Sequence, residues 1–281
     1  MNVWTENIAS RGSIEIASCL IKWIETYVLT VPDHPRNLRI FADNCGGQNK
    51  NILVTLALLR EIHLKHFDRI ELCYLVAGHS FSACDRAFGN IDGYLKKYSD
   101  ILSPQSYCSK IQHSRIKKDY PLYRMKSEDF LNFDVFIKDK IAYKKRVEDK
   151  AFLTAAQIVL TSEYPLGYIL KSAYNIPDSS GLKVRAAHPK LSESNFDLSQ
   201  VVLPPKYPQE RKLDAAKLKD LEYLTQYMCE AEGLWIKNLV ERQKSETVQA
   251  LVYESVDEED EIELEQDDND YEYDDHVRRI S

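Results

Sequence analysis

Acidic, amide and glycine residues crowd one stretch of the chain directly after a strand-like segment. The apolar run at residues 38–42 predicts a buried strand that ends at Asp43, and an apolar, helix-like run begins at residue 52. Seven small or polar residues lie between them: Asn44, Cys45, Gly46, Gly47, Gln48, Asn49 and Lys50. Because buried polar groups need partners, this density favours a functional site. The alternative is a polar loop in which Asn49 caps the helix.

A second stretch repeats this arrangement further along the chain. Residues 69–77 predict another buried strand, and residues 80–98 predict a helix that Ser80 or Ser82 caps and that carries Asp85 in its first turns. When a crossover helix joins adjacent parallel strands, their carboxyl ends lie at the same edge of the sheet. We therefore expect Asp43 and Asp85 to converge at that edge.

Two carboxylates at neighbouring strand ends are typical of a divalent-metal site. Mg²⁺ prefers carboxylate, phosphate and water oxygens, and two such ions about 3.5–4 Å apart activate a water and stabilise the leaving oxygen in phosphodiester cleavage. In this interpretation Asp43 and Asp85 bind Mg²⁺ or Mn²⁺. Five further side chains are candidates to contact water or substrate: Asn44, Gln48, Asn49, Lys50 and, also for proton transfer, His79.

The spacing supports other chemistry less well. Cys45, His79 and Cys84 would bind zinc only if the fold brought them together, since the chain has no CxxC or HxxxH pair there. Cys45 with His79 as its base would make a nucleophile pair, but a small side chain that fills a turn explains Cys45 better. The Gly-Gly turn lacks the GxxxxGK[ST] and GxGxxG patterns, which disfavours nucleoside triphosphate or NAD binding.

Length and composition narrow the class of protein. The 281 residues, 44% of them hydrophobic, suffice for one large domain or two small ones. We expect no transmembrane helix and no secretory signal, because long apolar runs and a basic start are missing. Six scattered cysteines without a CxxC pair favour reduced thiols. These features predict an intracellular protein, with the nucleus as one candidate compartment.

Charge is distributed unevenly along the chain. Residues 254–281 hold fourteen Asp and Glu but two Arg, so the rest carries 35 Lys and Arg against 30 acidic residues, although the whole chain has a net charge of −7. The tail has too much like charge to fold. A basic body, with basic side chains interleaved with tyrosines at residues 107–148, is typical of proteins that bind phosphates and stack on bases. A non-catalytic module that binds DNA or RNA is therefore the second hypothesis, with a solvated basic face as its alternative.

The remaining segments predict flanking elements. Ser13 is a candidate N-cap for a helix with Glu15 in its first turn, where the helix dipole alone favours a carboxylate. Residues 133–148 alternate enough to predict strands, and residues 158–175 predict a strand or hairpin around Pro165 to Gly167. Residues 209–245 predict a helix or helical pair. A protein-interaction scaffold that uses this segment and the acidic tail is the third hypothesis.

Three motifs resemble an uncharacterised family of transposon-derived eukaryotic proteins. They are W-x-E-x-x-A-x-R-G-x-x-E-I-x-S-C-L from Trp4 to Leu20, F-A-D-N-C-G-G-Q-N-K-N at residues 41–51, and G-H-S-F-x-x-C-D-R-x-F-G at residues 78–89. The resemblance is strongest over residues 3–100, and K-L-K-D-L-x-x-L at residues 217–224 resembles the family's C-terminal part more loosely. It implies a ribonuclease-H-like, transposase-type domain.

This resemblance also implies roles for the acids. Asp43 matches the acid of the fourth strand, Asp85 the last acid on a later helix, and Glu15 an additional helical Glu that some members of the wider fold carry, with Glu6 as its competitor. The chain starts at what would be the third strand, so we expect the first strand and its Asp to be missing from a truncated or degenerate copy.

The expected architecture is therefore an α/β, ribonuclease-H-like mixed sheet flanked by helices. We expect a core at residues 1–103, a basic, tyrosine-bearing strand and loop region at residues 104–208, a helical segment at residues 209–253 that is available to a protein partner, and a disordered acidic tail at residues 254–281. The leading functional hypothesis is a divalent-metal-dependent nuclease or transposase-type domain, either active or domesticated and inactive.

Overall fold

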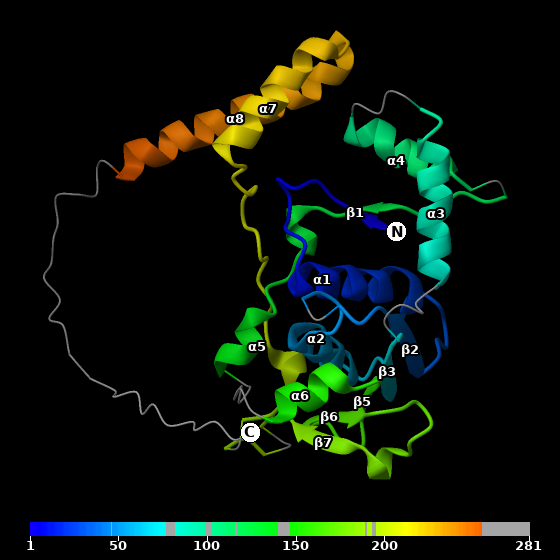
Figure 1. The fold of residues 1–281 in the computed structure, drawn as a ribbon. Coiled ribbons are helices and arrows are strands. Elements are labelled where there is room, and N and C mark those ends of the chain that lie inside the picture. The colour runs from blue at the N-terminus through cyan, green and yellow to red at the C-terminus, as the bar shows by residue number, and fades with distance from the viewer. Residues whose placement is uncertain are drawn as a thin grey trace, which may run out of the picture.

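The structure, a computed structural model, describes residues 1–45, 47–76, 82–98, 103–115, 117–139, 147–188, 190–192 and 195–254. A five-stranded mixed sheet forms its centre, helices pack against the sheet, and a helical pair stands apart from it (Figure 1). The strands are β1 (Asn2–Val3), β2 (Asn37–Ala42), β3 (Arg69–Tyr74), β4 (Tyr123–Arg124), β5 (Gln157–Thr161), β6 (Gly167–Lys171) and β7 (Leu182–Arg185). The α-helices are α1 (Ser13–Trp23), α2 (Ile52–His63), α3 (Ala83–Leu95), α4 (Pro104–His113), α5 (Asp134–Asp139), α6 (Val147–Thr154), α7 (Ala215–Leu224) and α8 (Glu230–Glu254).

The central sheet has the strand order β2-β3-β5-β6-β7. β2 and β3 are parallel, with Ala42 opposite Tyr74, and α2 forms the crossover that a parallel pair requires. The other neighbours, β3–β5, β5–β6 and β6–β7, are antiparallel. The predicted parallel pair, the predicted hairpin around residues 165–167 and the coarse prediction of a mixed α/β sheet flanked by helices are therefore confirmed.

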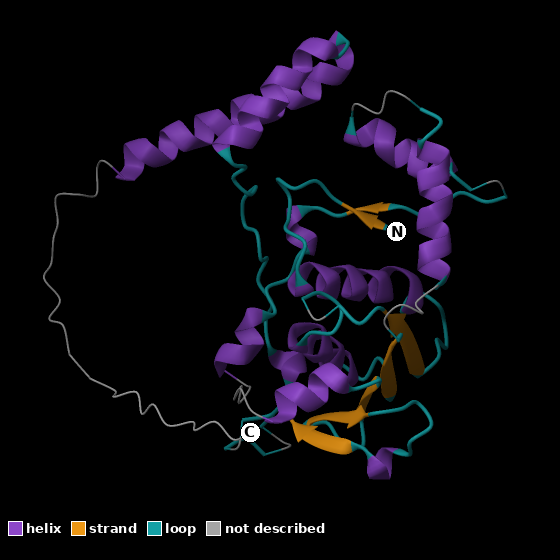
Figure 2. Ribbon diagram, in the orientation of Figure 1, coloured by secondary structure: helices purple, strands orange, loops and turns teal. Residues whose placement is uncertain are grey.

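The main hydrophobic core lies between the sheet and two layers of helix. α2 packs between α1 and the strands (Figure 2), and nine of its twelve residues are buried. A helix that is apolar on nearly all sides belongs inside a core, and each fully buried Leu or Ile contributes roughly 1.5–3 kcal/mol. Leu56, Leu58 and Leu59 on α2 and Ile158 on β5 are fully buried. This core fixes the position of β2 and β3 relative to α2.

β2 differs from the prediction because it is not a buried strand. It pairs with β3 alone among the described strands, and its residues alternate between exposed and half-buried, with Phe41 59% exposed. An edge strand keeps one row of side chains in water, whereas β3 has neighbours on both sides and is buried along most of its length. The apolar sequence of β2 therefore reflects only the face that packs on the main core, where Leu38, Ile40 and Ala42 lie.

Two helix starts also differ from the predictions by one or two residues. Gly12 rather than Ser13 precedes the first turn of α1, and its backbone N–H donates to the Glu15 carboxylate at 2.7 Å. Asn51 rather than Asn49 caps α2, because the Asn51 side chain accepts from the Leu53 N–H at 2.9 Å. Ser82 caps α3, as predicted.

The strands predicted over residues 133–148 are wrong, because α5 and α6 begin in this stretch and residues 140–146 lie outside the described part of the chain. Phe133 and Phe136 are both buried, and their rings are 5.9 Å apart. A separation of three residues places side chains on one face of a helix, so this pair follows a helical period rather than the period of two that predicted strands.

The predicted helical pair at residues 209–245 is confirmed as α7 and α8. They pack on each other through a small apolar cluster centred on Leu218, Ile236 and Val240, which is separate from the main core. Residues 255–281, most of the predicted acidic tail, lie outside the described residues. Within the described ranges, no helix combines the length and apolar character that crossing a membrane requires.

Candidate functional site

Asp43 stands at the carboxyl end of β2 with an exposed side chain. Its Oδ1 accepts hydrogen bonds from the Cys45 backbone N–H at 3.4 Å and from the Asn49 side-chain amide. Its Oδ2 accepts none from any described residue. The loop therefore fixes one carboxylate oxygen and leaves the other directed to solvent or to a ligand.

The rest of the loop after β2 is tied to neighbouring elements. The Gln48 side-chain amide donates to the Arg11 carbonyl at 3.4 Å, and the Asn49 carbonyl accepts from the Tyr74 hydroxyl at 3.4 Å. Asn44 is exposed. These contacts place the predicted water- and substrate-binding amides between the start of α1 and the end of β3.

Lys50 does not line the loop surface, although the sequence predicted that it would contact substrate. It is 2% exposed, and its ammonium donates to the carbonyls of Leu153 and Ala155, both at 2.6 Å. The ammonium also lies 4.8 Å from the centre of the Tyr74 ring. Burial lowers the pKa of Lys50. The two carbonyls at the end of α6 stabilise the buried ammonium, because the C-terminus of a helix favours positive charge. Lys50 thus fastens the loop to the core.

Glu15 lies buried at the start of α1, and both of its carboxylate oxygens are occupied. Oε2 accepts from the Gly12 N–H, and Oε1 accepts from the Tyr207 hydroxyl. Burial, and next the bond to Glu15, raise the pKa of Tyr207. In this arrangement Glu15 joins α1 to the segment that leads to α7.

Asp85 is exposed in the first turn of α3. Its Oδ2 accepts from the Ser82 backbone N–H at 2.6 Å and from the Ser82 hydroxyl at 2.7 Å, and these bonds lower the pKa of Asp85. Its Oδ1 has no side-chain partner among the described residues. Asp85 therefore caps its helix with one oxygen and keeps the other available.

The three acids do not share a hydrogen-bond network. Asp43 and Asp85 both follow the carboxyl ends of the parallel strands β2 and β3, whereas Glu15 has partners on other segments. His79 lies in residues 77–81, outside the described residues. No group of three or more His, Cys, Asp or Glu side chains in the described ranges is arranged to hold a metal ion.

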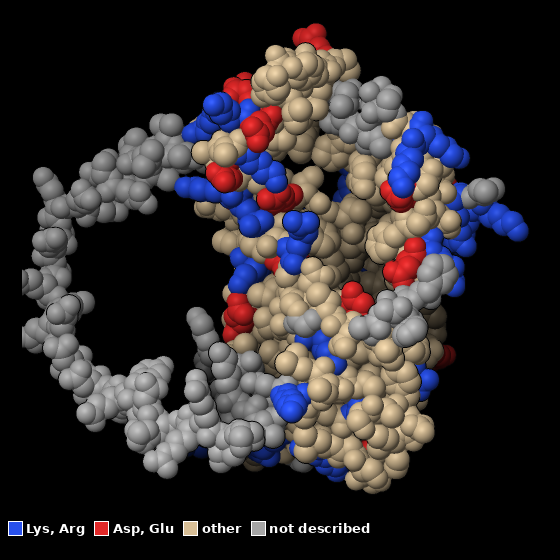
Figure 3. Space-filling view, in the orientation of Figure 1, with Lys and Arg blue, Asp and Glu red and all other residues tan. Residues whose placement is uncertain are grey.

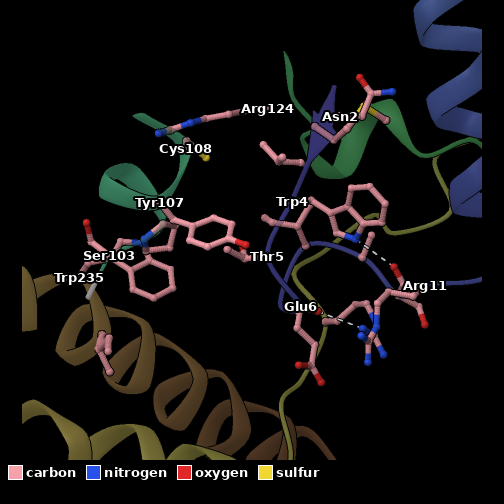
Figure 4. A pocket seen from close by; sticks show the side chains of 18 of the residues that line it. Asn2, Trp4, Thr5, Glu6, Arg11, Ser103, Tyr107, Cys108, Arg124 and Trp235 are labelled. Carbon is pink, nitrogen blue, oxygen red and sulfur yellow. Dashed lines mark hydrogen bonds between the residues drawn. The ribbon is translucent and has the colours of Figure 1, made fainter. Parts of the chain in front are cut away.

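A cleft that the sequence did not reveal lies elsewhere in the molecule, with a volume of about 1120 Å³. Three segments distant in sequence line it: residues 2–11, the start of α4 with Arg124, and the helical pair with the loop before it (Figure 4). Tyr107 and Arg124 belong to the predicted basic, tyrosine-bearing stretch. Trp4, Arg11, Arg211, Lys217 and Trp235 were missed, because the three segments are far apart in the sequence and no local spacing links them.

All six cysteines lie in described parts of the chain, and none forms a disulfide bond. Cys45 and Cys84 are exposed, and Cys73 and Cys108 are buried.

Comparison with known proteins gives one match. Residues 3–157, which include the parallel pair β2–β3 and the helices from α1 to α6, match a family described as Domain of unknown function (DUF7869). No curated protein matches the chain, and no solved structure matches it. Because the matched segment covers more than half of the 281 residues, the chain belongs to the DUF7869 family.

Proposed function

We propose that the chain is a transposase-derived, ribonuclease-H-like domain whose chemistry is divalent-metal-dependent cleavage or transfer of phosphodiesters. The observation that carries this proposal is the parallel, in-register pairing of β2 and β3. Asp43 directly follows one strand, and the chain that continues from the other leads to Asp85. In open α/β sheets, ligands bind outside the carboxyl ends of such strands. The motifs that resemble transposon-derived proteins at residues 4–20, 41–51 and 78–89 all lie inside the family match.

The three candidate acids differ in the exposure of their carboxylates and in the hydrogen bonds that these accept. Asp43 and Asp85 are exposed, and each keeps one oxygen without a partner among the described residues. Glu15 has no oxygen to spare. Mg²⁺ and Mn²⁺ are bound by carboxylate oxygens together with water molecules. The exposed carboxylates of Asp43 and Asp85 suit such an ion, whereas the buried carboxylate of Glu15 does not.

The other loop residues would then orient the Asp43 carboxylate, water and phosphate, and would not bind the metal ion themselves. The Asn49 amide and the Cys45 N–H fix Asp43 through Oδ1, and the exposed Asn44 is free to orient water or a phosphate oxygen. Fixed outer partners of this kind raise the affinity of a site for its ion. A bound divalent ion would supply charge neutralisation for the phosphate and an activated water.

Titration with Mn²⁺ or Mg²⁺ tests the proposal. We expect Asp43→Asn and Asp85→Asn each to weaken binding of the ion by about tenfold or more, since each removes one charged ligand. Asp68→Asn is the matched control, because Asp68 is a half-exposed Asp at the opposite end of β3, paired with Arg36. Calorimetry or the electron paramagnetic resonance signal of free Mn²⁺ measures the binding.

Two results separate the versions of this proposal. Binding that Asp43→Asn abolishes, together with Mg²⁺-dependent cleavage of labelled DNA or RNA, supports an active enzyme. The same binding without cleavage supports a domesticated, inactive domain. Equal metal affinity in wild type, Asp43→Asn and Asp68→Asn would contradict the metal site in both versions.

A further inference from the structure

We propose that the cleft between residues 2–11, α4 and the helical pair α7–α8 binds a segment of single-stranded nucleic acid. This site is distinct from the end of β2 that carries Asp43 and from the start of α3 that carries Asp85. It requires no metal ion, so it stands whether or not the strand ends are catalytic.

The charge of the cleft is the first support. Among the described residues, four cationic side chains line it, Arg11, Arg124, Arg211 and Lys217, whereas Glu6 is the one acidic residue. Lys217 pairs with Glu6, and this contact is the main reason why the pKa of Glu6 lies below its usual value. Figure 3 shows basic side chains gathered beside the hollow under the helical pair. The excess of positive charge fits the phosphates of a polyanion.

Two of these cations are available for a new partner. The Arg11 side chain is exposed and makes no hydrogen bond or ion pair within the described residues. Arg124 is exposed and donates to the neutral Gln105 side chain at 2.6 Å, so no carboxylate neutralises it. Arg211 instead donates to the Glu6 carbonyl at 3.0 Å and helps to hold the cleft together.

Aromatic rings are the second support. Tyr107 on α4 and Trp235 on α8 are 45% and 37% exposed, and both line the cleft with Trp4. In Figure 4 the Tyr107 ring points into the space between α8 and the segment that carries Trp4. The Trp4 indole is held in place by its bond to the Ser10 carbonyl at 2.9 Å and by an edge contact with Phe130. Exposed rings beside cations are the combination on which single-stranded bases stack.

The size and composition of the cleft favour this ligand over others. A volume of about 1120 Å³ leaves room for several nucleotides. A duplex hides the faces of its bases, so it leaves Tyr107 and Trp235 without stacking partners. An acidic peptide satisfies the cations but not the rings.

The experiment measures fluorescence anisotropy of a labelled oligo(dT) of about twelve nucleotides, a length within the usual range for single-strand sites. It uses the full chain, and EDTA is present so that metal binding at the strand ends plays no part. We expect Tyr107→Ala to weaken binding about 5- to 150-fold and Tyr107→Phe to restore it, because stacking needs the ring and not the hydroxyl. Tyr223→Ala, which removes a 60% exposed tyrosine of α7 outside the cleft, leaves the affinity unchanged.

Salt dependence gives a second, independent readout. Arg124→Gln should reduce the slope of log affinity against log salt by about one, since it removes one phosphate contact. Lys96→Gln, directly after α3, is the matched control, because Lys96 is exposed and lies outside the cleft, and it leaves the slope unchanged.

Three outcomes would overturn the proposal. The first is equal affinity for oligo(dT) and for a duplex of the same length. The second is oligo(dT) binding that Tyr107→Ala leaves unaltered. The third is that a synthetic acidic peptide of residues 256–281 binds more tightly than oligo(dT) and loses affinity in the same variants, which would assign the cleft to an acidic peptide. Asp43→Asn should bind oligo(dT) as wild type does, so failure of the metal site does not count against the cleft.

Discussion

The strand-end site and the cleft are assembled in opposite ways. Asp43 and its partners Cys45 and Asn49 lie within seven residues of one another, so one βα connection builds that half of the strand-end site. The cleft draws Trp4, Tyr107 and Trp235 from three distant segments. The first site therefore depends on local sequence, and the second exists only where the helical pair meets the body.

The two regions also differ in how firmly they are held. The loop after β2 is fastened by the buried Lys50 ammonium, whose hydrogen bonds to carbonyls are charge-assisted and shielded from water. The helical pair meets the N-terminal segment through the exposed Glu6–Lys217 pair, and exposed ion pairs contribute about 0–1 kcal/mol. We therefore expect substitutions at the loop to change stability and substitutions at the cleft to change binding.

The largest effect is expected for Lys50→Ala. It leaves the carbonyls of Leu153 and Ala155 without their buried donor and should lower the free energy of unfolding by about 2–4 kcal/mol. Urea denaturation followed by circular dichroism measures this change. Lys96→Ala, at an exposed position directly after α3, serves as the control and should stay within about 0.5 kcal/mol of wild type. An equally small effect of Lys50→Ala would mean that the loop is not fastened in this way.

An intermediate effect is expected for Tyr207→Phe, which tests the link between α1 and the segment leading to the helical pair. Loss of the hydroxyl leaves Glu15 with one bond in a buried position, at a cost of about 1–3 kcal/mol. Because the pKa of Tyr207 is raised, its contribution is complete below pH 10 and is lost as pH rises through the folded-state value.

Unfolding at pH 7 and above pH 10 checks both parts of this prediction. Tyr27→Phe is the control, since Tyr27 is exposed and its hydroxyl has no hydrogen-bond partner among the described residues. If Tyr207→Phe and Tyr27→Phe were equally harmless, the bond from Tyr207 to Glu15 would not stabilise the link between α1 and the segment that leads to α7.

The smallest effect, and one of opposite sign, is expected for Glu6→Gln. It removes the acidic group of the cleft lining and releases Lys217, so oligo(dT) affinity should rise by about two- to fivefold. Because the pKa of Glu6 is lowered from 4.5, the carboxylate stays charged above that value and the gain is constant between pH 5.5 and 8. Anisotropy titrations at several pH values measure it, with the exposed Glu25→Gln as control. A loss of affinity in Glu6→Gln would show that the ion pair shapes the cleft.

Much of the central fold follows from local patterns. The strand before Asp43, the crossover helix, the second strand and the β5–β6 hairpin all follow from apolar runs bounded by polar or turn residues. The same reasoning predicted that Asp43 and Asp85 come after two parallel strands. Parallel strands joined by a crossover helix end at the same edge of the sheet, and this depends on the order of the elements and not on distant contacts.

Local patterns failed where a long-range contact chose between two states. The alternation over residues 133–148 predicted strands, whereas the buried pair Phe133 and Phe136 follows the period of a helix. Lys50 was predicted to contact substrate, whereas its ammonium donates to the buried carbonyls of Leu153 and Ala155.

The sequence by itself determined the parallel pair, the exposed acid after β2, the capped start of α3 and the helical segment near the C-terminus, because hydrophobic period and turn chemistry act over a few residues. Only the tertiary structure decided that β2 lies at an edge, that Glu15 and Lys50 are buried with their partners, and that Trp4, Tyr107 and Trp235 share a cleft. The burial of a side chain and the contacts between residues distant in sequence depend on how the helices and the sheet pack, and the spacing of residues along the chain does not determine them.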